Sequence, residues 1–139
     1  MTKPKVILFA DDDVWLVRPF INELEDSGYR VLLARTGTEA LDQLSKQEVD
    51  LLVLDIMMPT GDRVADSAEG RRTGVKVAEF VRREMKARLP IIYFTVISDR
   101  DVHQILEHIE KSAGLKPRIL VKPVLPEELV EEVKNCLGE

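Results

Sequence analysis

The sequence predicts a single α/β domain in which helices cover both faces of a parallel β-sheet. Three observations lead to this prediction. Five short apolar runs alternate along the chain with five longer amphipathic stretches. The apolar runs are continuous, which is typical of strands that are buried on both faces of a sheet. The length of 139 residues matches one domain of ordinary size, with a core that needs no disulfides.

Each predicted strand is a short run of mainly aliphatic and aromatic residues. Two of the runs stop directly at an aspartate, Asp11 and Asp55. Runs of this length are typical of strands in globular proteins. The five predicted strands are Val6–Ala10, Tyr29–Ala34, Leu51–Leu54, Ile91–Val96 and Ile119–Val121.

Each predicted helix carries apolar residues at helical spacing. Asp13 and Thr36 are residue types that cap helix N-termini, and Gly28 ends the first helix. Pro19 lies inside the first helix, so we expect either a kink or a later start there. The five predicted helices are Val14–Ser27, Thr36–Gln47, Val75–Ala87, Val102–Ser112 and Glu127–Leu137.

Alternation of strands and helices with right-handed crossovers predicts a flavodoxin-like (βα)5 sheet with the strand order 2-1-3-4-5. One connection, Pro59 to Gly74, is polar and far longer than the usual two to six residues. We interpret it as a surface loop, with a partner-specific lid as the alternative. The residues after Lys122 suffice for one helix only, so we expect no output domain.

Composition excludes several classes of protein. There are 20 Lys and Arg against 25 Asp and Glu, which argues against a nucleic-acid or membrane-surface binder that relies on positive charge. The single cysteine, Cys136, excludes an internal disulfide and a cysteine-based zinc site. The apolar runs are too short to span a bilayer, and no signal-peptide pattern follows Met1. We therefore expect a cytoplasmic protein.

Chemically active residues follow the strands of the predicted sheet. Asp11–Asp13 come after the first strand and Asp55 after the third, and these two strands are neighbours in the predicted order. Clustered carboxylates repel one another unless they are protonated or neutralised by a cation, and oxygen ligands suit Mg²⁺. Thr95 and Lys122 end the fourth and fifth strands. Each residue alone has an ordinary structural explanation, but together they indicate a site for a metal-bound phosphoryl group.

Four segments of the chain match a known family pattern. They are Val6–Asp13, Leu51–Pro59, Pro90–Thr95 and Ile119–Pro123. With the sequence Asp-Ile-Met-Met-Pro from Asp55 to Pro59, the chain resembles the receiver domain of two-component response regulators over essentially its whole length.

The resemblance implies a metal site and a phosphoacceptor. Asp55 would be the carboxylate nucleophile that forms an aspartyl phosphate. Asp11 and Asp12 would hold Mg²⁺ together with Asp55 and the backbone carbonyl of Met57. The donor would be a histidine kinase or a histidine phosphotransfer protein, and the domain would be a switch, not an enzyme in its own right.

The resemblance also assigns roles to the last two strand ends. Thr95 would hydrogen-bond the phosphoryl group, and Lys122 would pair with its oxygens. The Lys122–Pro123 peptide bond would be cis. In this family the face formed by the fourth helix, fifth strand and fifth helix usually contacts partners, and a homodimer through that face is one option.

Some positions depart from the family pattern. Ile119 stands where an aromatic switch residue is usual, so the coupling of the threonine to this position is in doubt. Met57, Val96 and Ile97 are bulkier or more apolar than usual around the acceptor, and we hypothesise slow autodephosphorylation. Trp15, just after the aspartates, is expected to pack against the first helix.

Two other functions compete with the switch. A haloacid-dehalogenase-type phosphatase would use Asp11 as nucleophile and Asp13 as acid or base, but no later acidic pair completes its metal site. A binding module that is never phosphorylated is the third hypothesis. Asp55→Asn would abolish labelling of a receiver, whereas Asp11→Asn would abolish turnover by a phosphatase.

Overall fold

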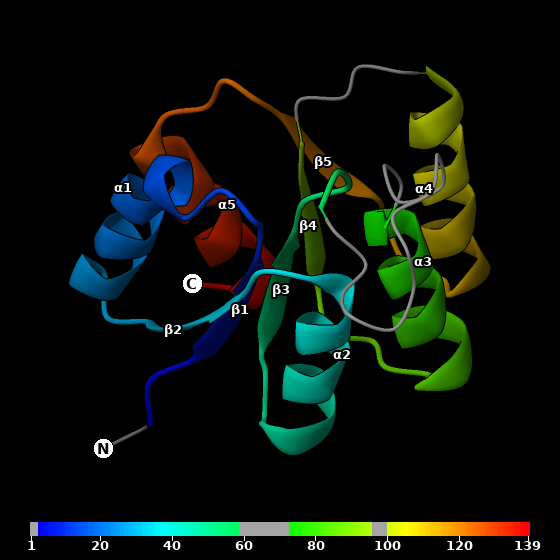
Figure 1. Cartoon of the computed structure of the whole chain (residues 1–139), viewed down its shortest axis with the longest axis horizontal. Helices are drawn as coiled ribbons and strands as arrows, with labels where there is room; N and C mark the ends of the chain where they lie inside the picture. The colour runs from blue at the N-terminus through cyan, green and yellow to red at the C-terminus, as the bar shows by residue number, and fades with distance from the viewer. Residues whose placement is uncertain (1–2, 59–72, 96–99) are drawn as a thin grey trace.

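The computed structural model describes residues 3–58, 73–95 and 100–139. It contains five strands in one sheet, in the order β2-β1-β3-β4-β5, and every neighbouring pair is parallel. Figure 1 shows the sheet edge-on between two layers of helices. The predicted fold class and strand order are therefore confirmed.

The strands occupy the apolar runs that the sequence identifies. All four residues of β3 and all five of β4 are buried, because these strands lie inside the sheet with helices on both faces. The bounds are β1 Val6–Ala10, β2 Arg30–Ala34, β3 Leu51–Leu54, β4 Ile91–Thr95 and β5 Arg118–Val121.

The helices begin and end close to the predicted residues. Asp13 caps α1, accepting a hydrogen bond from the Leu16 amide at 3.2 Å. The helix thus starts at Val14 and the expectation of a later start at Pro19 is wrong, because the cap stabilises the first turn ahead of the proline. The bounds are α1 Val14–Asp26, α2 Gly37–Lys46, α3 Thr73–Glu79, α4 Arg100–Ser112 and α5 Pro126–Leu137.

The third helix differs from its prediction at both ends. It begins at Thr73, whereas the sequence predicts a connection that runs through Gly74 and a helix that starts at Val75. Thr73 and Gly74 are instead buried in the first turn of the helix. It continues as a π-helical segment, η2, from Phe80 to Glu84. Most of the expected loop, residues 59–72, lies outside the described residues, as do Val96 and Ile97 of the expected fourth strand and its connection.

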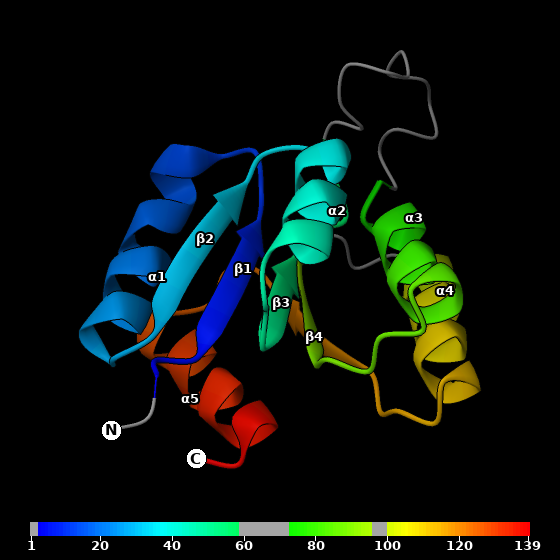
Figure 2. The ribbon, with the colours of Figure 1, turned by 90° about the horizontal axis from the view of Figure 1, so that it is seen from below.

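The two layers of helices enclose two separate apolar cores. Figures 1 and 2 show α1 and α5 on one face of the sheet and α2, α3 and α4 on the other. Phe9 and Phe94 belong to the core under α1 and α5, with their rings edge to face at a centroid distance of 5.8 Å. Leu52 and Tyr93 belong to the core under the other three helices. The sheet is held from both sides and presents only its edges to solvent.

The amino-terminal end of β4 lies beside a buried ion pair. Arg82, in η2, donates from Nε and Nη2 to the two carboxylate oxygens of Glu110 in α4, at 2.7 and 2.8 Å. Its Nη1 donates to the carbonyls of Ala87 and Leu89 at 3.0 and 2.7 Å. Both charged side chains are almost fully buried. This pair joins η2 and α4 to the connection that leads into β4.

No helix within the described ranges has the length and apolar character needed to cross a bilayer.

Candidate functional site

Four strands end at the same edge of the sheet, next to residues that the sequence singles out. Asp11 follows β1, Asp55 follows β3 and Lys122 follows β5, while Thr95 is the last residue of β4. The backbone ladder continues through these positions. The Asp55 amide donates to the Ala10 carbonyl at 2.9 Å, and the Lys122 amide donates to the Thr95 carbonyl at 2.8 Å. The sheet therefore fixes the positions of all four residues.

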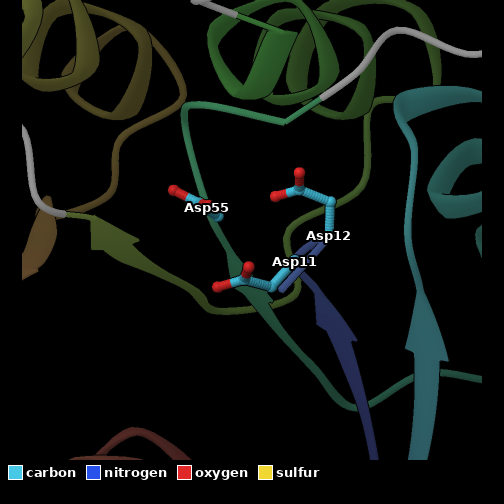
Figure 3. A group of neighbouring side chains, drawn as sticks. All are labelled: Asp11, Asp12 and Asp55. Atoms are coloured by element: carbon cyan, nitrogen blue, oxygen red, sulfur yellow. The ribbon is translucent and has the colours of Figure 1, made fainter. Parts of the chain in front are cut away.

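Three aspartates form a carboxylate cluster at this edge. Each of Asp11, Asp12 and Asp55 offers a carboxylate oxygen within 4.8 Å of the others. Figure 3 shows Asp11 and Asp12 at the end of β1 and Asp55 at the end of β3, with their side chains around a common space. Asp11 and Asp55 are buried, whereas Asp12 is exposed. Three oxygen donors from rigid positions fit a hard divalent cation such as Mg²⁺.

One lysine ammonium group accompanies the cluster. Lys122 Nζ lies 2.9 Å from Asp11 Oδ2 and 4.8 Å from the centre of the Phe94 ring. The Lys122–Pro123 peptide bond is cis, in agreement with the expectation from the resemblance. The other oxygen of Asp11 accepts the Asp13 amide at 3.0 Å. Asp11 is thereby held in place, and Lys122 is kept at the site by a carboxylate and an aromatic face.

The electrostatics of the cluster are unfavourable without a cation. Burial, and then the neighbouring Asp11 carboxylate, raises the pKa of Asp55 to about 7, although Lys122 and the Met57 amide act in the opposite direction. Burial and the two adjacent aspartates also raise the pKa of Asp12. Carboxylates whose pKa is raised in this way gain most from a nearby positive charge.

The loop after β3 is shaped by a glycine. The Gly74 amide donates to the Ile56 carbonyl at 3.0 Å. A Cβ atom at Gly74 would lie 2.5 Å from the Asp55 carbonyl oxygen and 2.6 Å from the Ile56 Cα, both of which are backbone atoms. No other residue fits here without moving the acceptor strand. This close approach to the backbone of β3 and its following loop explains why glycine is needed at this position.

The remaining predicted residues take different positions. Met57 donates its amide to Asp55 Oδ1 at 3.2 Å and has a partly exposed side chain. Thr95 is fully buried. Ile119 is half-buried and stands opposite Tyr93 in the β4–β5 register, packed against the core under α3 and α4. No aromatic side chain is present at this position of β5.

An apolar surface beside the carboxylates was not predicted. The expectation that Trp15 packs against the first helix is wrong, because its side chain is 89% exposed at the start of α1. Leu16 and Leu125 are also exposed. The buried residues of α1 are Val17, Ile21 and Leu24, and Trp15, two positions before Val17, falls on the opposite side of the helix.

Of the exposed side chains Trp15, Leu16 and Leu125, Leu16 lines a hollow of about 330 Å³. Its walls are mainly apolar, and the site lysine, Lys122, contributes to them. The full lining is Leu16, Val17, Phe20, Phe94, Lys122, Pro123 and Val124. Lys122, which is paired with Asp11 of the carboxylate cluster, thus also lines an exposed apolar groove.

Comparison with known proteins gives a consistent result. The family model described as the response regulator receiver domain matches residues 7–134. The alkaline phosphatase synthesis transcriptional regulatory protein PhoP of Bacillus subtilis is 32% identical over 136 residues, which cover 96% of this chain and 48% of that protein. The chain spans about half the length of several curated relatives that it matches.

Two further relatives are similar over their whole length. The polar-differentiation response regulator DivK of Brucella anthropi is 24% identical over 137 residues, covering 98% of each chain. The solved structure of the chemotaxis response regulator CheY4 of Vibrio cholerae has a TM-score of 0.73 and 26% identity, with 96% of this chain and 98% of that chain covered. On the family match and these similarities, the chain belongs to the response regulator receiver domain family.

Proposed function

We propose that this chain is a phosphorylation-dependent switch, in which Asp55 accepts a phosphoryl group from phosphohistidine on a histidine kinase or phosphotransfer protein in the cytoplasm. The observation that carries the proposal is the carboxylate cluster of Asp11, Asp12 and Asp55, with Lys122 bound to its most buried member. Receiver domains are signalling modules that generally bind Mg²⁺ at such an acidic pocket. Output would pass through protein–protein contacts.

The transfer assigns a role to each residue of the cluster. A carboxylate oxygen of Asp55 attacks phosphorus, an O–P bond forms, and the N–P bond breaks with its electron pair returning to the donor imidazole. Asp11, Asp12, Asp55 and the Met57 carbonyl would hold Mg²⁺. When bound, the ion neutralises the carboxylates and the phosphoryl oxygens. Asp55 must be ionised to attack, so relief of its raised pKa favours the reaction.

Two further residues would bind the product. Lys122 already lies at the site, 2.9 Å from Asp11, and its ammonium group can pair with a phosphoryl oxygen as charge builds up there. Thr95 lies at the adjacent strand end and would hydrogen-bond another phosphoryl oxygen. Because Ile119 stands in place of the aromatic switch residue, coupling from Thr95 to the α4–β5–α5 face would lack the aromatic side chain that is usual in the family.

The apolar groove beside the site is where we place the phosphodonor. Trp15, Leu16 and Leu125 are exposed. Leu16 and Lys122 both line the hollow. A protein that delivers phosphohistidine to Asp55 must cover the carboxyl edge of the sheet, and these side chains are the apolar area next to it. The family of the chain supports the class of this donor but does not identify it.

The phosphatase hypothesis is not supported by the geometry. Its proposed acid or base, Asp13, caps α1 through the Leu16 amide. Its proposed nucleophile, Asp11, is bound to Lys122 and to the Asp13 amide. Family membership also accounts for the Asp55 motif, which a phosphatase would leave unexplained.

Intact mass after incubation with acetyl phosphate, with and without Mg²⁺, tests the proposal. We expect one phosphoryl adduct that needs Mg²⁺ and is absent from Asp55→Asn. The matched control is Asp13→Asn, which makes the same chemical change next to the cluster and keeps a residue that caps helices. It should be labelled like the wild type.

Three results would contradict the proposal. The first is an adduct that survives in Asp55→Asn. The second is labelling that is unaffected by removal of Mg²⁺. The third is the absence of an adduct both from acetyl phosphate and from a phosphorylated histidine phosphotransfer protein, which would favour a binding module that is never phosphorylated.

A further inference from the structure

A second cavity, of about 280 Å³, lies at the opposite edge of the sheet. Pro90 and Ile91 at the start of β4, Gly114 and Leu115 after α4, and Cys136 of α5 contribute to its walls. Figure 2 shows the connections into β4 and β5 together at this edge, away from the arrowheads of the strands. The cavity is thus separated from the carboxylate cluster by the length of the sheet.

Four of the five charged residues that line the cavity are cationic. Arg82, Arg88, Lys116 and Arg118 line it, against one carboxylate, Glu110. Arg82 and Glu110 neutralise each other in a buried, bidentate ion pair. That pair has fixed geometry and forms part of the wall. Arg88, Lys116 and Arg118 remain around the opening, the last of them paired with Glu132.

These three cations are only partly satisfied by the protein. Arg118 pairs with Glu132 at 2.9 Å, and both side chains are partly exposed. Arg88 donates from Nη1 to the Ala113 carbonyl at 2.7 Å and has no ion pair with a carboxylate of residues 3–58, 73–95 or 100–139. Lys116 is exposed and has no ion pair within the same ranges. A concave surface with this charge is unusual in a chain whose net charge is −5.

We propose that this cavity binds a small polyoxyanion, a ligand with several phosphate or carboxylate oxygens, through Arg88, Lys116 and Arg118. Guanidinium groups match such oxygens in pairs. A volume of about 280 Å³ is close to the lower end of small-molecule sites and is too small for a folded partner. The hydrogen bond to Ala113 restrains Arg88, so little side-chain conformational freedom is lost on binding.

Titration with pyrophosphate or citrate, followed by amide NMR shifts, tests the site. The protein is first freed of metal on a chelating resin, and the buffer holds no polyanion and little salt, so the carboxylate cluster carries no cation and repels the anions. We expect saturable shifts in residues 88–91 and 113–118. A larger response to pyrophosphate than to citrate would identify the ligand as a phosphate compound, and the reverse order a carboxylate compound.

Substitutions separate a specific site from general attraction. Lys116→Gln should weaken binding about tenfold, as expected for the loss of one charge-assisted contact. Lys111→Gln removes the same charge from α4 but lies outside the lining, so its affinity should match the wild type. Arg88→Gln also removes the bond to Ala113. Its result counts only if its amide spectrum shows that it is folded.

The single thiol of the chain gives an independent measurement. Cys136 lines the cavity, and burial raises its pKa to about 11. A bound anion should shield this thiol, so pyrophosphate should slow its alkylation by iodoacetamide in the wild type, and much less so in Lys116→Gln. Absence of saturable shifts, or equal losses of affinity in Lys116→Gln and Lys111→Gln, would overturn the proposal.

Discussion

The two edges of the sheet bury charge in opposite ways. At the carboxyl edge, Asp11 and Asp55 are buried beside a third aspartate, and one lysine offsets them. At the amino edge, Glu110 is buried as deeply, but both of its oxygens receive hydrogen bonds from Arg82. One buried cluster is short of positive charge, and the other is fully paired.

The difference separates a structural ion pair from a binding site. A buried charge is unfavourable unless it is paired. A cluster of buried carboxylates that repel one another is therefore stabilised when a ligand of opposite charge binds. Arg82 and Glu110 need nothing further, because η2 and α4 supply both partners. In the proposed function, a cation and a phosphoryl group would complete the aspartate cluster.

The largest expected effect is at the paired edge. Arg82→Met leaves the Glu110 carboxylate buried without its partner and also removes two hydrogen bonds to backbone carbonyls. We expect a loss of about 3–5 kcal/mol in the free energy of unfolding, measured by urea denaturation. The double variant Arg82→Met, Glu110→Met should recover part of this loss, since it buries no unpaired charge.

An exposed arginine on the same helical segment is the control. Arg83 lies 3.9 Å from Glu79, with both side chains largely exposed, so Arg83→Met should change stability by less than about 1 kcal/mol. Equal losses from Arg82→Met and Arg83→Met would contradict the distinction between the buried pair and a surface pair.

The second prediction concerns pH at the carboxylate edge. The pKa of Asp55 is about 7 in the folded, metal-free protein, against 3.8 for an ordinary aspartate. Between these pH values the folded state retains a proton that the unfolded state releases, so stability falls as pH rises from about 4 to about 7. Relative to Asp55→Asn, the wild type in EDTA should lose about 2–4 kcal/mol over this range.

Urea denaturation at a series of pH values measures this difference. Mg²⁺ at about 100 times its dissociation constant should restore about 2.7 kcal/mol to the wild type at neutral pH, and less to Asp55→Asn. Asp26→Asn, at an exposed position of α1, should follow the wild type at every pH. Parallel pH profiles for the wild type and Asp55→Asn would show that Asp55 carries no such penalty.

The carboxylate edge could be predicted from sequence because strand ends are local features. An apolar run that stops at Asp11, Asp55 or Lys122 indicates where a strand ends, and a parallel sheet brings those ends to one edge. The strand order then makes Asp11 and Asp55 neighbours. These steps need only periodicity and topology, which is why the fold and the grouping of these residues could be predicted.

The amino edge could not be predicted in the same way. Arg82 and Glu110 are 28 positions apart, and each stands on a helix where a charged residue is usually solvated. Their burial depends on how η2 and α4 pack together. Such features follow from tertiary packing and leave no periodic pattern in the chain.

The smallest expected effect concerns the lifetime of the phosphoryl group. The Met57 side chain is 38% exposed beside Asp55, and its thioether is too weak an acceptor to position a water molecule for attack on phosphorus. We therefore expect slow hydrolysis, with a half-life well above seconds. Met57→Asn supplies an amide that can orient water, and should speed hydrolysis up to about tenfold, which corresponds to about 1.4 kcal/mol in the barrier.

Loss of the phosphoryl adduct, followed by intact mass after removal of the donor, measures this rate. Met57→Leu keeps the position apolar and should match the wild type, which separates the hydrogen-bonding effect from a change of shape. A half-life of only seconds in the wild type, or equal rates in Met57→Asn and Met57→Leu, would contradict the idea. In that case residues other than Met57 would control the access of water to Asp55 and hence the lifetime of the phosphoryl group.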